Sequence, residues 1–473
     1  MIHHLMKNCN VSQLLIPIFS NISSLDLHQN NIAADGIRYL SDALQSNTKL
    51  TNLNLLQNKI ALKGAQYLSN TLTVLNLSGN RIRDKGTQYL TKGLESNNTL
   101  KTLDLGWNQI GDQGARILST TLRSNQALAV LNLSGNTIGD DGAHYISAAL
   151  QSNRTLTSLN LSGNPLGDEG AYQFGIVLPR NKTLTTLDLS WNQIGNQGAQ
   201  YLSTALQSNK ALTTLYLHRN KISYVGAQYL SNALQFNKTL TILNLSWNEI
   251  GDEGARYLSI ALQLNKTLQS LNLAGNTFRD DVARHMGLTL KYNETLTTLN
   301  LSGNPMEDRS LKFLSDSLQR NKSLTTIDLS WNQIGNRAAQ YLNALLKSNK
   351  TLTTLNLSEN TIGDEGILHI STGLKSNKTL TTISLSRNQI GNSGAKYLAE
   401  ALKLNRTLIT LDLSRNQIGI EGVQQLNNAV ELNHILTTID LSLNHVKEEI
   451  LKYFGFGSKL NDTDEISVNN SYA

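Results

Sequence analysis

The chain has 473 residues and a formal net charge of +6 at pH 7, which is a small excess for this length. Its single cysteine, Cys9, excludes a disulfide framework and leaves no second thiol for a zinc site. No nucleic-acid-binding motif accompanies the weak positive charge, so a nucleic-acid partner is not expected.

Residues 1–21 contain a short apolar run, Val11 to Phe19, which Pro17 interrupts. We predict that this segment is an N-terminal cap covering the core of the first structural unit. A signal peptide is the alternative, and it is disfavoured because the first predicted strand, Leu25 to Leu27, follows within a few residues. No apolar stretch reaches the length of a membrane span.

From residue 22 to residue 445 the chain repeats one sequence unit. Asparagines mark it at positions 30, 58 and 80, and then every 28 residues to 444; we call these the ladder asparagines. A clear copy is LTTLDLSWNQIGNQGAQYLSTALQSN, from Leu184 to Asn209. A fixed period of this length is typical of a solenoid, in which each unit packs only against its neighbours.

Each copy predicts a strand, a turn and a helix. Leu184, Leu187 and Leu189 alternate with polar residues, as in a strand with one buried face. The ladder residue Asn192 enters the turn, where its amide can bond backbone groups that leave the sheet. Asn196 is the predicted N-cap of the helix that follows it, a position that holds Asp at 112, 140, 168, 252 and 364.

The return loop after each helix is rich in Asn-X-Ser/Thr sequons. We interpret them as repeat consensus rather than as glycosylation sites. They include the sequons at Asn181, Asn237, Asn265, Asn349, Asn377 and Asn405. Lysines also recur in these loops, and we interpret them as a solubilising surface, with an anion-binding band as the alternative.

The pattern LxxLxLxxNxIGxxGxxxLxxxL, over about residues 22 to 446, resembles the ribonuclease-inhibitor-like type of leucine-rich repeat. The resemblance implies an α/β fold, namely a right-handed solenoid of about 16 repeats of 28 residues with a concave parallel sheet and convex helices. Parallel strands lie about 4.8 Å apart and packed helices about 8–10 Å apart, so such a stack should bend into a horseshoe.

Similar repeats occur in NOD-like receptor arms, Ran GTPase-activating proteins and effectors of intracellular bacteria. The activity that these proteins share is protein binding, and a fold by itself does not determine function.

After the repeats, residues 446–457 predict a C-terminal capping helix, and residues 458–473 predict a disordered polar tail. A secretion signal of an exported bacterial effector is the alternative interpretation of that tail.

All four tryptophans occupy one repeat position, immediately before a ladder asparagine, where the strands end. We call the residues at this position the rim row. Its candidate partner-binding members are Trp107, Trp191, Arg219, Trp247, Trp331, Glu359, Arg387 and Arg415. Tryptophan and arginine are enriched at binding hot spots. Two alternatives stay open: each indole packs on an adjacent repeat, or a duplication of five repeats copied two tryptophans into four.

One repeat departs from the others at three positions. Tyr216 replaces the Asn or Asp found at most equivalent strand positions, and His218 and Arg219 follow it. We predict that Asn and Asp at this strand position bond up the ladder of repeats. We predict further that Tyr216, His218 and Arg219 recognise a partner at the centre of the inner face.

The sequence offers little for catalysis. No histidine pair has metal-ligand spacing and no glycine-rich loop ends in Lys-Ser/Thr, so we expect no enzyme activity, no cofactor and no metal. The predicted function is a cytoplasmic, monomeric scaffold that binds a protein through the concave face and rim, including an effector acting on host proteins. The alternatives are a GTPase activator using Arg81, Arg83 or Arg116, and the sensing arm of a NOD-like receptor.

Overall fold

The computed structural model describes residues 22–33, 36–38, 40, 47–60, 71–447 and 450. The chain divides into two compact units, residues 1–248 and residues 249–473. The predicted N-terminal cap (1–21) and polar tail (458–473) lie outside the described residues, as does most of the predicted capping helix (446–457).

The described part of the first unit holds strands that pair in parallel, each with the next in the chain. The strands are β1 Ser24–Asp26, β2 Asn52–Asn54, β3 Val74–Asn76, β4 Thr102–Asp104, β5 Val130–Asn132, β6 Ser158–Asn160, β7 Thr186–Asp188, β8 Thr214–Tyr216 and β9 Ile242–Asn244. The helices are α5 Arg83–Ser96, α6 Asp112–Ser124, α7 Asp140–Leu150, α8 Gly167–Val177, α9 Asn196–Ser208 and α10 Tyr224–Phe236.

The second unit has the same organisation in its described residues. Its strands are β10 Ser270–Asn272, β11 Thr298–Asn300, β12 Thr326–Asp328, β13 Thr354–Asn356, β14 Thr382–Ser384, β15 Thr410–Asp412 and β16 Thr438–Asp440. Its helices are α11 Gly251–Leu264, α12 Asp280–Tyr292, α13 Asp308–Leu318, α14 Asn336–Ser348, α15 Asp364–Leu374, α16 Asn392–Leu402 and α17 Ile420–Leu432.

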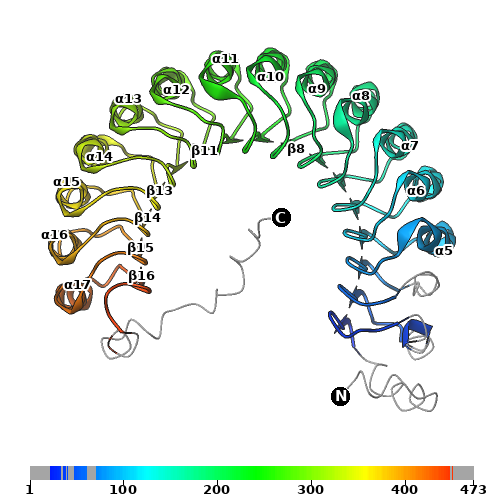
Figure 1. Cartoon of the computed structure of the whole chain (residues 1–473), viewed down its shortest axis with the longest axis horizontal. Coiled ribbons are helices and arrows are strands. Elements are labelled where there is room, and N and C mark those ends of the chain that lie inside the picture. The colour runs from blue at the N-terminus through cyan, green and yellow to red at the C-terminus, as the bar shows by residue number, and fades with distance from the viewer. Residues whose placement is uncertain are drawn as a thin grey trace. The chain divides into compact units, whose positions relative to one another are not determined.

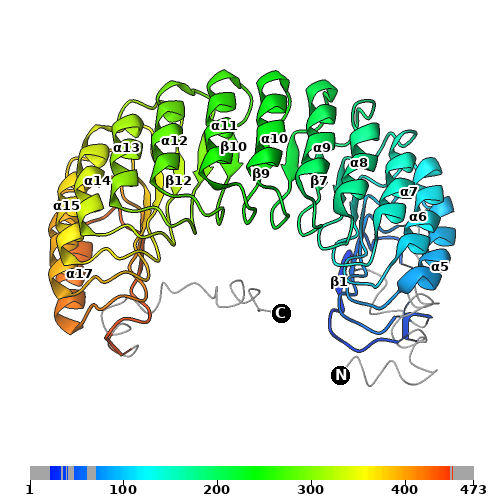
Figure 2. The same cartoon turned by 45° about the horizontal axis from the view of Figure 1, so that its top comes forward.

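Within each unit the strands form one layer and the helices the other, and the helices run side by side (Figures 1 and 2). The core lies between these layers. In one repeat, Leu187 and Leu189 of the strand side, Ile194 of the turn, and Leu202 and Leu206 of α9 are all buried. The predicted parallel sheet and strand–turn–helix repeat are confirmed.

The ladder asparagines bond backbone groups of the turns, as predicted, and they also reach the neighbouring repeat. Asn136 donates from Nδ2 to the carbonyls of Leu105 (3.0 Å) and Leu133 (2.8 Å). Its Oδ1 accepts from the backbone N–H groups of Asn108 (3.0 Å) and Ile110 (2.9 Å) in the preceding repeat. One buried amide therefore satisfies backbone groups of two repeats that have no strand partner.

The return loops contain a second row of structural asparagines. Asn181 is buried, donates from Nδ2 to the Leu150 carbonyl (2.9 Å) and accepts from the Leu184 N–H (2.8 Å). The other return-loop asparagines named above, Asn237, Asn265, Asn349, Asn377 and Asn405, are buried at the same repeat position. These amides hold the folded structure together and are not accessible to a glycan, which agrees with their interpretation as repeat consensus.

The prediction that Asn196 and its Asp equivalents cap their own helices is wrong. The N-cap of α9 is Gly195, which has no side-chain bond to offer. Asn196 Oδ1 instead accepts from Ser223 N and Gly226 N, both 2.9 Å away, at the start of α10. At most of these positions Asp or Asn thus caps the helix of the next repeat, because the first residue of one helix faces the unpaired N–H groups of its neighbour.

We expect the substitution Asp112→Ala to lower the unfolding free energy by about 1–2 kcal/mol, because Gly139 N and Gly142 N lose their acceptor at 2.7 and 3.0 Å. The matched control is Asp140→Ala. Asp140 has the same repeat position, but its carboxylate accepts no hydrogen bond from the described residues, since Gly167 N donates to the Asn192 carbonyl instead (2.9 Å). Urea denaturation followed by circular dichroism compares the two, and equal losses would contradict capping between repeats.

Candidate functional site

The rim row has a left-handed backbone throughout. All of its residues, from Gln29 to Leu443, have φ between 49° and 70°. Glycine adopts this conformation without strain, which accounts for glycine at positions 79, 135, 163, 275 and 303 of the row. A tryptophan here is unfavourable for the backbone. Backbone preference therefore does not explain the four tryptophans.

The indoles pack partly on neighbouring repeats and stay substantially exposed. The exposed fractions are 69% for Trp107, 51% for Trp191, 38% for Trp247 and 54% for Trp331. The Trp107 ring lies directly over Gly135, and a Cβ added to Gly303 would come within 2.9 Å of Trp331 Cε3. The packing alternative therefore accounts for part of each ring surface, and the remainder faces solvent.

Three consecutive rim residues of the first unit form a stack. The Arg219 guanidinium carbon lies 4.2 Å from the ring centroid of Trp191 and 4.9 Å from that of Trp247. Strands in a sheet are spaced by about 4.8 Å, so flat side chains at one position of successive strands lie at stacking distance. Backbone bonds from Trp191 N to His218 O and from Arg219 N to Ser246 O, both 2.9 Å, fix this spacing.

The prediction that inner-face Asn and Asp residues bond up the ladder needs correction. Asp188 Oδ1 accepts from Ser190 N at 2.9 Å, two residues on in its own repeat, and so forms an Asx turn. Among the described strands, all but β8 and β14 have this bond. Tyr216 in β8 cannot make this bond, so its repeat lacks the Asx turn and has a phenol side chain at this position instead.

We expect Tyr216→Asn to raise the unfolding free energy by about 0.5–1 kcal/mol, because it restores the Asx turn found in the neighbouring repeats. Tyr216→Phe is the control and should leave stability unchanged, since the Tyr216 hydroxyl makes no hydrogen bond within the described residues. Both changes are measured by urea denaturation. A loss of stability in Tyr216→Asn would show that the phenol is retained for packing.

His218 lies half-buried beside Tyr216, and its Nδ1 is 2.6 Å from Ser190 Oγ. Burial lowers the pKa of His218 below the ordinary 6.5, the Asp188 carboxylate opposes the shift, and Arg219 adds to it. The imidazole is therefore neutral at pH 7, which leaves Arg219 as the cation of the cluster formed by Tyr216, His218 and Arg219.

A pH dependence follows from this lowered pKa. The folded chain binds the His218 proton more weakly than the unfolded chain does. The neutral His218 imidazole therefore makes its full contribution to the free energy of unfolding above pH 6.5. This contribution is lost as the pH falls from 6.5 through the lowered pKa. We expect His218→Asn, which does not titrate, to reduce the fall in thermal midpoint below pH 6.5. An identical fall in both proteins would contradict the lowered pKa.

The rim row of the second unit contains charged residues that are partly neutralised. Glu359 and Arg387 form an ion pair with Oε1 and Nη1 3.2 Å apart, and both are exposed. Arg415 follows in the next repeat and is also exposed. The structure thus places the predicted residues of this unit in one row, with one arginine already paired.

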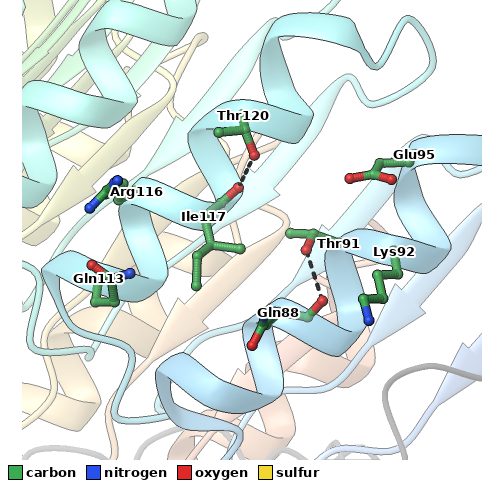
Figure 3. Close-up of a pocket in the computed structure, with 8 residues that line it drawn as sticks. All are labelled: Gln88, Thr91, Lys92, Glu95, Gln113, Arg116, Ile117 and Thr120. Atoms are coloured by element: carbon green, nitrogen blue, oxygen red, sulfur yellow. Dashed lines mark hydrogen bonds between the residues drawn. The ribbon is translucent and has the colours of Figure 1, made fainter.

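A shallow groove of about 330 Å³ lies on the outer surface between α5 and α6 (Figure 3). Its lining mixes Lys92 and Arg116 with Glu95 and neutral side chains. Thr91 and Thr120 donate to carbonyls of their own helices, at 3.0 and 2.7 Å, so their hydroxyls are already engaged. The groove is a mixed-charge helix surface.

The arginines considered for GTPase activation lie apart from the stack of Trp191, Arg219 and Trp247. Arg81 and Arg83 are exposed, and Arg83 Nε donates to Gln109 Oε1 at 3.0 Å. The Arg116 guanidinium lies 5.9 Å from the centroid of the Tyr145 ring.

Nowhere in the described ranges do three or more His, Cys, Asp or Glu residues gather as a metal site. Among the described helices we also find none long and apolar enough to span a bilayer.

The chain matches the family model described as Leucine Rich repeat along most of its length. The matched segments are residues 46–69, 68–90, 96–119, 124–147, 152–175, 180–203, 236–259, 264–281, 292–315, 320–342, 348–371, 376–399 and 404–426. No curated protein sequence matches the chain.

Two similar solved structures can be compared with the chain. The chain is similar to the TLR13–ssRNA13 complex, with 19% identity and a TM-score of 0.54 over 92% of this chain and 68% of that one. It is also similar to an internalin of Listeria monocytogenes, with 20% identity and a TM-score of 0.41 over 93% of each chain. At 19% identity the TLR13 similarity supports the fold and nothing beyond it, and the internalin match, with a TM-score below 0.5, adds no support.

Proposed function

The chain belongs to the leucine-rich repeat family, and we propose that it binds a protein partner through the inner strand face and the rim row of its first unit. The fold supports a protein-binding scaffold, because successive repeats present one long surface. We propose a cytoplasmic setting, where an exported bacterial effector would also act. The buried sequon asparagines agree with it, since they could not carry glycans in the folded chain.

The observation that carries the proposal is the stack of Trp191, Arg219 and Trp247 at an exposed edge. Tryptophan and arginine are the side chains that most often dominate binding energy. Here they are kept at a position where the backbone favours glycine, and Tyr216 replaces a turn-forming residue beside them. Departures from a repeat that reduce local stability are typical of functional positions.

Affinity capture of partners from cytosol, with three immobilised forms of the chain as baits, tests this proposal. The wild-type chain is compared with the variant carrying Trp191→Ala and Trp247→Ala, and with Phe236→Ala as a control at the exposed end of α10. We expect at least one protein to be retained by wild type and by Phe236→Ala and lost from the tryptophan variant. Its binding to purified chain must show the same dependence. Equal retention of every protein by all three baits would contradict the proposal.

A further inference from the structure

We propose that the stack of Trp191, Arg219 and Trp247 holds a carboxylate of an acidic, extended protein segment on the Arg219 guanidinium. This inference rests on the proposed function and specifies the chemistry of the partner. The two indoles cover the faces of the guanidinium, and the centroids of the Trp191 and Trp247 rings lie 4.2 and 4.9 Å from its carbon. The N–H donors lie in the guanidinium plane, so their edge remains available between the rings.

The donors of Arg219 are unused. Within the described residues the Arg219 side chain forms cation–π contacts but no hydrogen bond and no ion pair. Its orientation is nevertheless restrained by the two rings, so little conformational entropy remains to be lost on binding. A planar carboxylate matches the fork of a guanidinium with two parallel hydrogen bonds. The arginine is thus positioned in advance for a bidentate acceptor.

The charges around the stack favour a singly charged acceptor. Lys221 is exposed on the same edge, and its Nζ donates to Gln193 Oε1 at 3.3 Å, so one of its N–H donors is already engaged. Asp188 lies one strand away with its Oδ1 in a turn bond, and its charge acts on His218. The acidic neighbour opposes a dianionic phosphate more than a carboxylate. Phosphate sites usually gather several cations, whereas this stack offers one guanidinium.

An extended acidic segment also suits the surroundings of the stack. Trp191 and Trp247 keep exposed ring surface on which the apolar stems of Glu side chains can lie. The Tyr216 hydroxyl, without a hydrogen-bond partner in the described part of the chain, can pair with a backbone group of the segment. Single-stranded nucleic acid could stack on the same rings, so it forms one arm of the test.

The test titrates the full chain with a hexaglutamate peptide and follows indole fluorescence. Trp107→Phe and Trp331→Phe remove the background of the other two tryptophans. Arg219→Gln removes the charge, and Arg219→Lys keeps the charge without the planar fork. Arg387→Gln is the matched control at the same rim position of the second unit. Hexaglutamine, a phosphoserine hexapeptide and a short single-stranded RNA complete the set of probes.

We expect hexaglutamate to bind, Arg219→Gln to weaken it by at least about tenfold, Arg219→Lys to weaken it by a smaller factor, and Arg387→Gln to leave it unchanged. Hexaglutamine should not bind. Tighter binding of the phosphopeptide or RNA than of hexaglutamate, or equal affinity in Arg219→Gln, would overturn the inference. A captured protein that depends on both tryptophans but not on Arg219 would also overturn it, while leaving the proposed function intact.

Discussion

Replacing the ladder residue Asn136 with Ala is expected to lower the unfolding free energy by about 3 kcal/mol or more. The side chain serves the carbonyls of Leu105 and Leu133 and the N–H groups of Asn108 and Ile110, all within 3.0 Å. Each buried backbone group that loses its partner costs about 1–3 kcal/mol. Water can replace some of these bonds, which keeps the total below the full sum.

Asn232→Ala is the control for this substitution. Asn232 lies exposed on α10, its side chain makes no hydrogen bond within the described residues, and it should tolerate alanine with little change in stability. Urea denaturation followed by circular dichroism measures both variants. A loss in Asn136→Ala no larger than that in Asn232→Ala would show that the asparagine ladder does not stabilise the repeats.

Replacing Trp191 or Trp247 with Ala is expected to weaken binding of the captured partner by about 2 kcal/mol or more for each substitution. Both rings contribute their own exposed surface, and both restrain Arg219. The effects should therefore be coupled. In the background of Arg219→Ala, each tryptophan substitution should cost less than it does in the wild-type chain.

Measurements of thermal stability distinguish a binding role of the two tryptophans from a purely structural packing role. Exposed rings on the rim support no core, so we expect thermal midpoints of the tryptophan variants to stay close to wild type. Trp331→Ala is the matched control, since Trp331 has the same repeat position but belongs to the second unit, outside the proposed binding surface. Variants of Trp191 and Trp247 that unfold early and yet bind with full affinity would identify these rings as packing residues.

Periodicity was sufficient to predict the strands, turns and helices of the repeats, because alternation of leucines and one buried asparagine recur in every copy. It was insufficient to assign the caps. Asn196 stands at the start of α9, where a sequence pattern points to its own helix, but its carbonyl oxygen reaches the start of α10. The partner of a side chain in a solenoid can lie a whole repeat away, which local spacing cannot reveal.

The candidate site was predicted only as a row of residues. That Trp191, Arg219 and Trp247 share one repeat position in consecutive copies is visible in the sequence, and strand spacing would have predicted their stacking. The left-handed backbone of the row was not anticipated, although glycine at five of its positions was the available signal. The side toward which each ring leans depends on its neighbours, as Trp107 over Gly135 and Trp331 beside Gly303 show.

Hydroxyl-radical footprinting of the complex with the captured partner tests the central claim most directly, because every tryptophan of the chain lies in the rim row and reports on it separately. We predict that the partner protects Trp191 and Trp247 from oxidation and leaves the side chains of the α5–α6 groove, such as Ile117, as reactive as in the free chain. Unchanged oxidation of Trp191 and Trp247, with protection in the groove, would contradict binding through the rim.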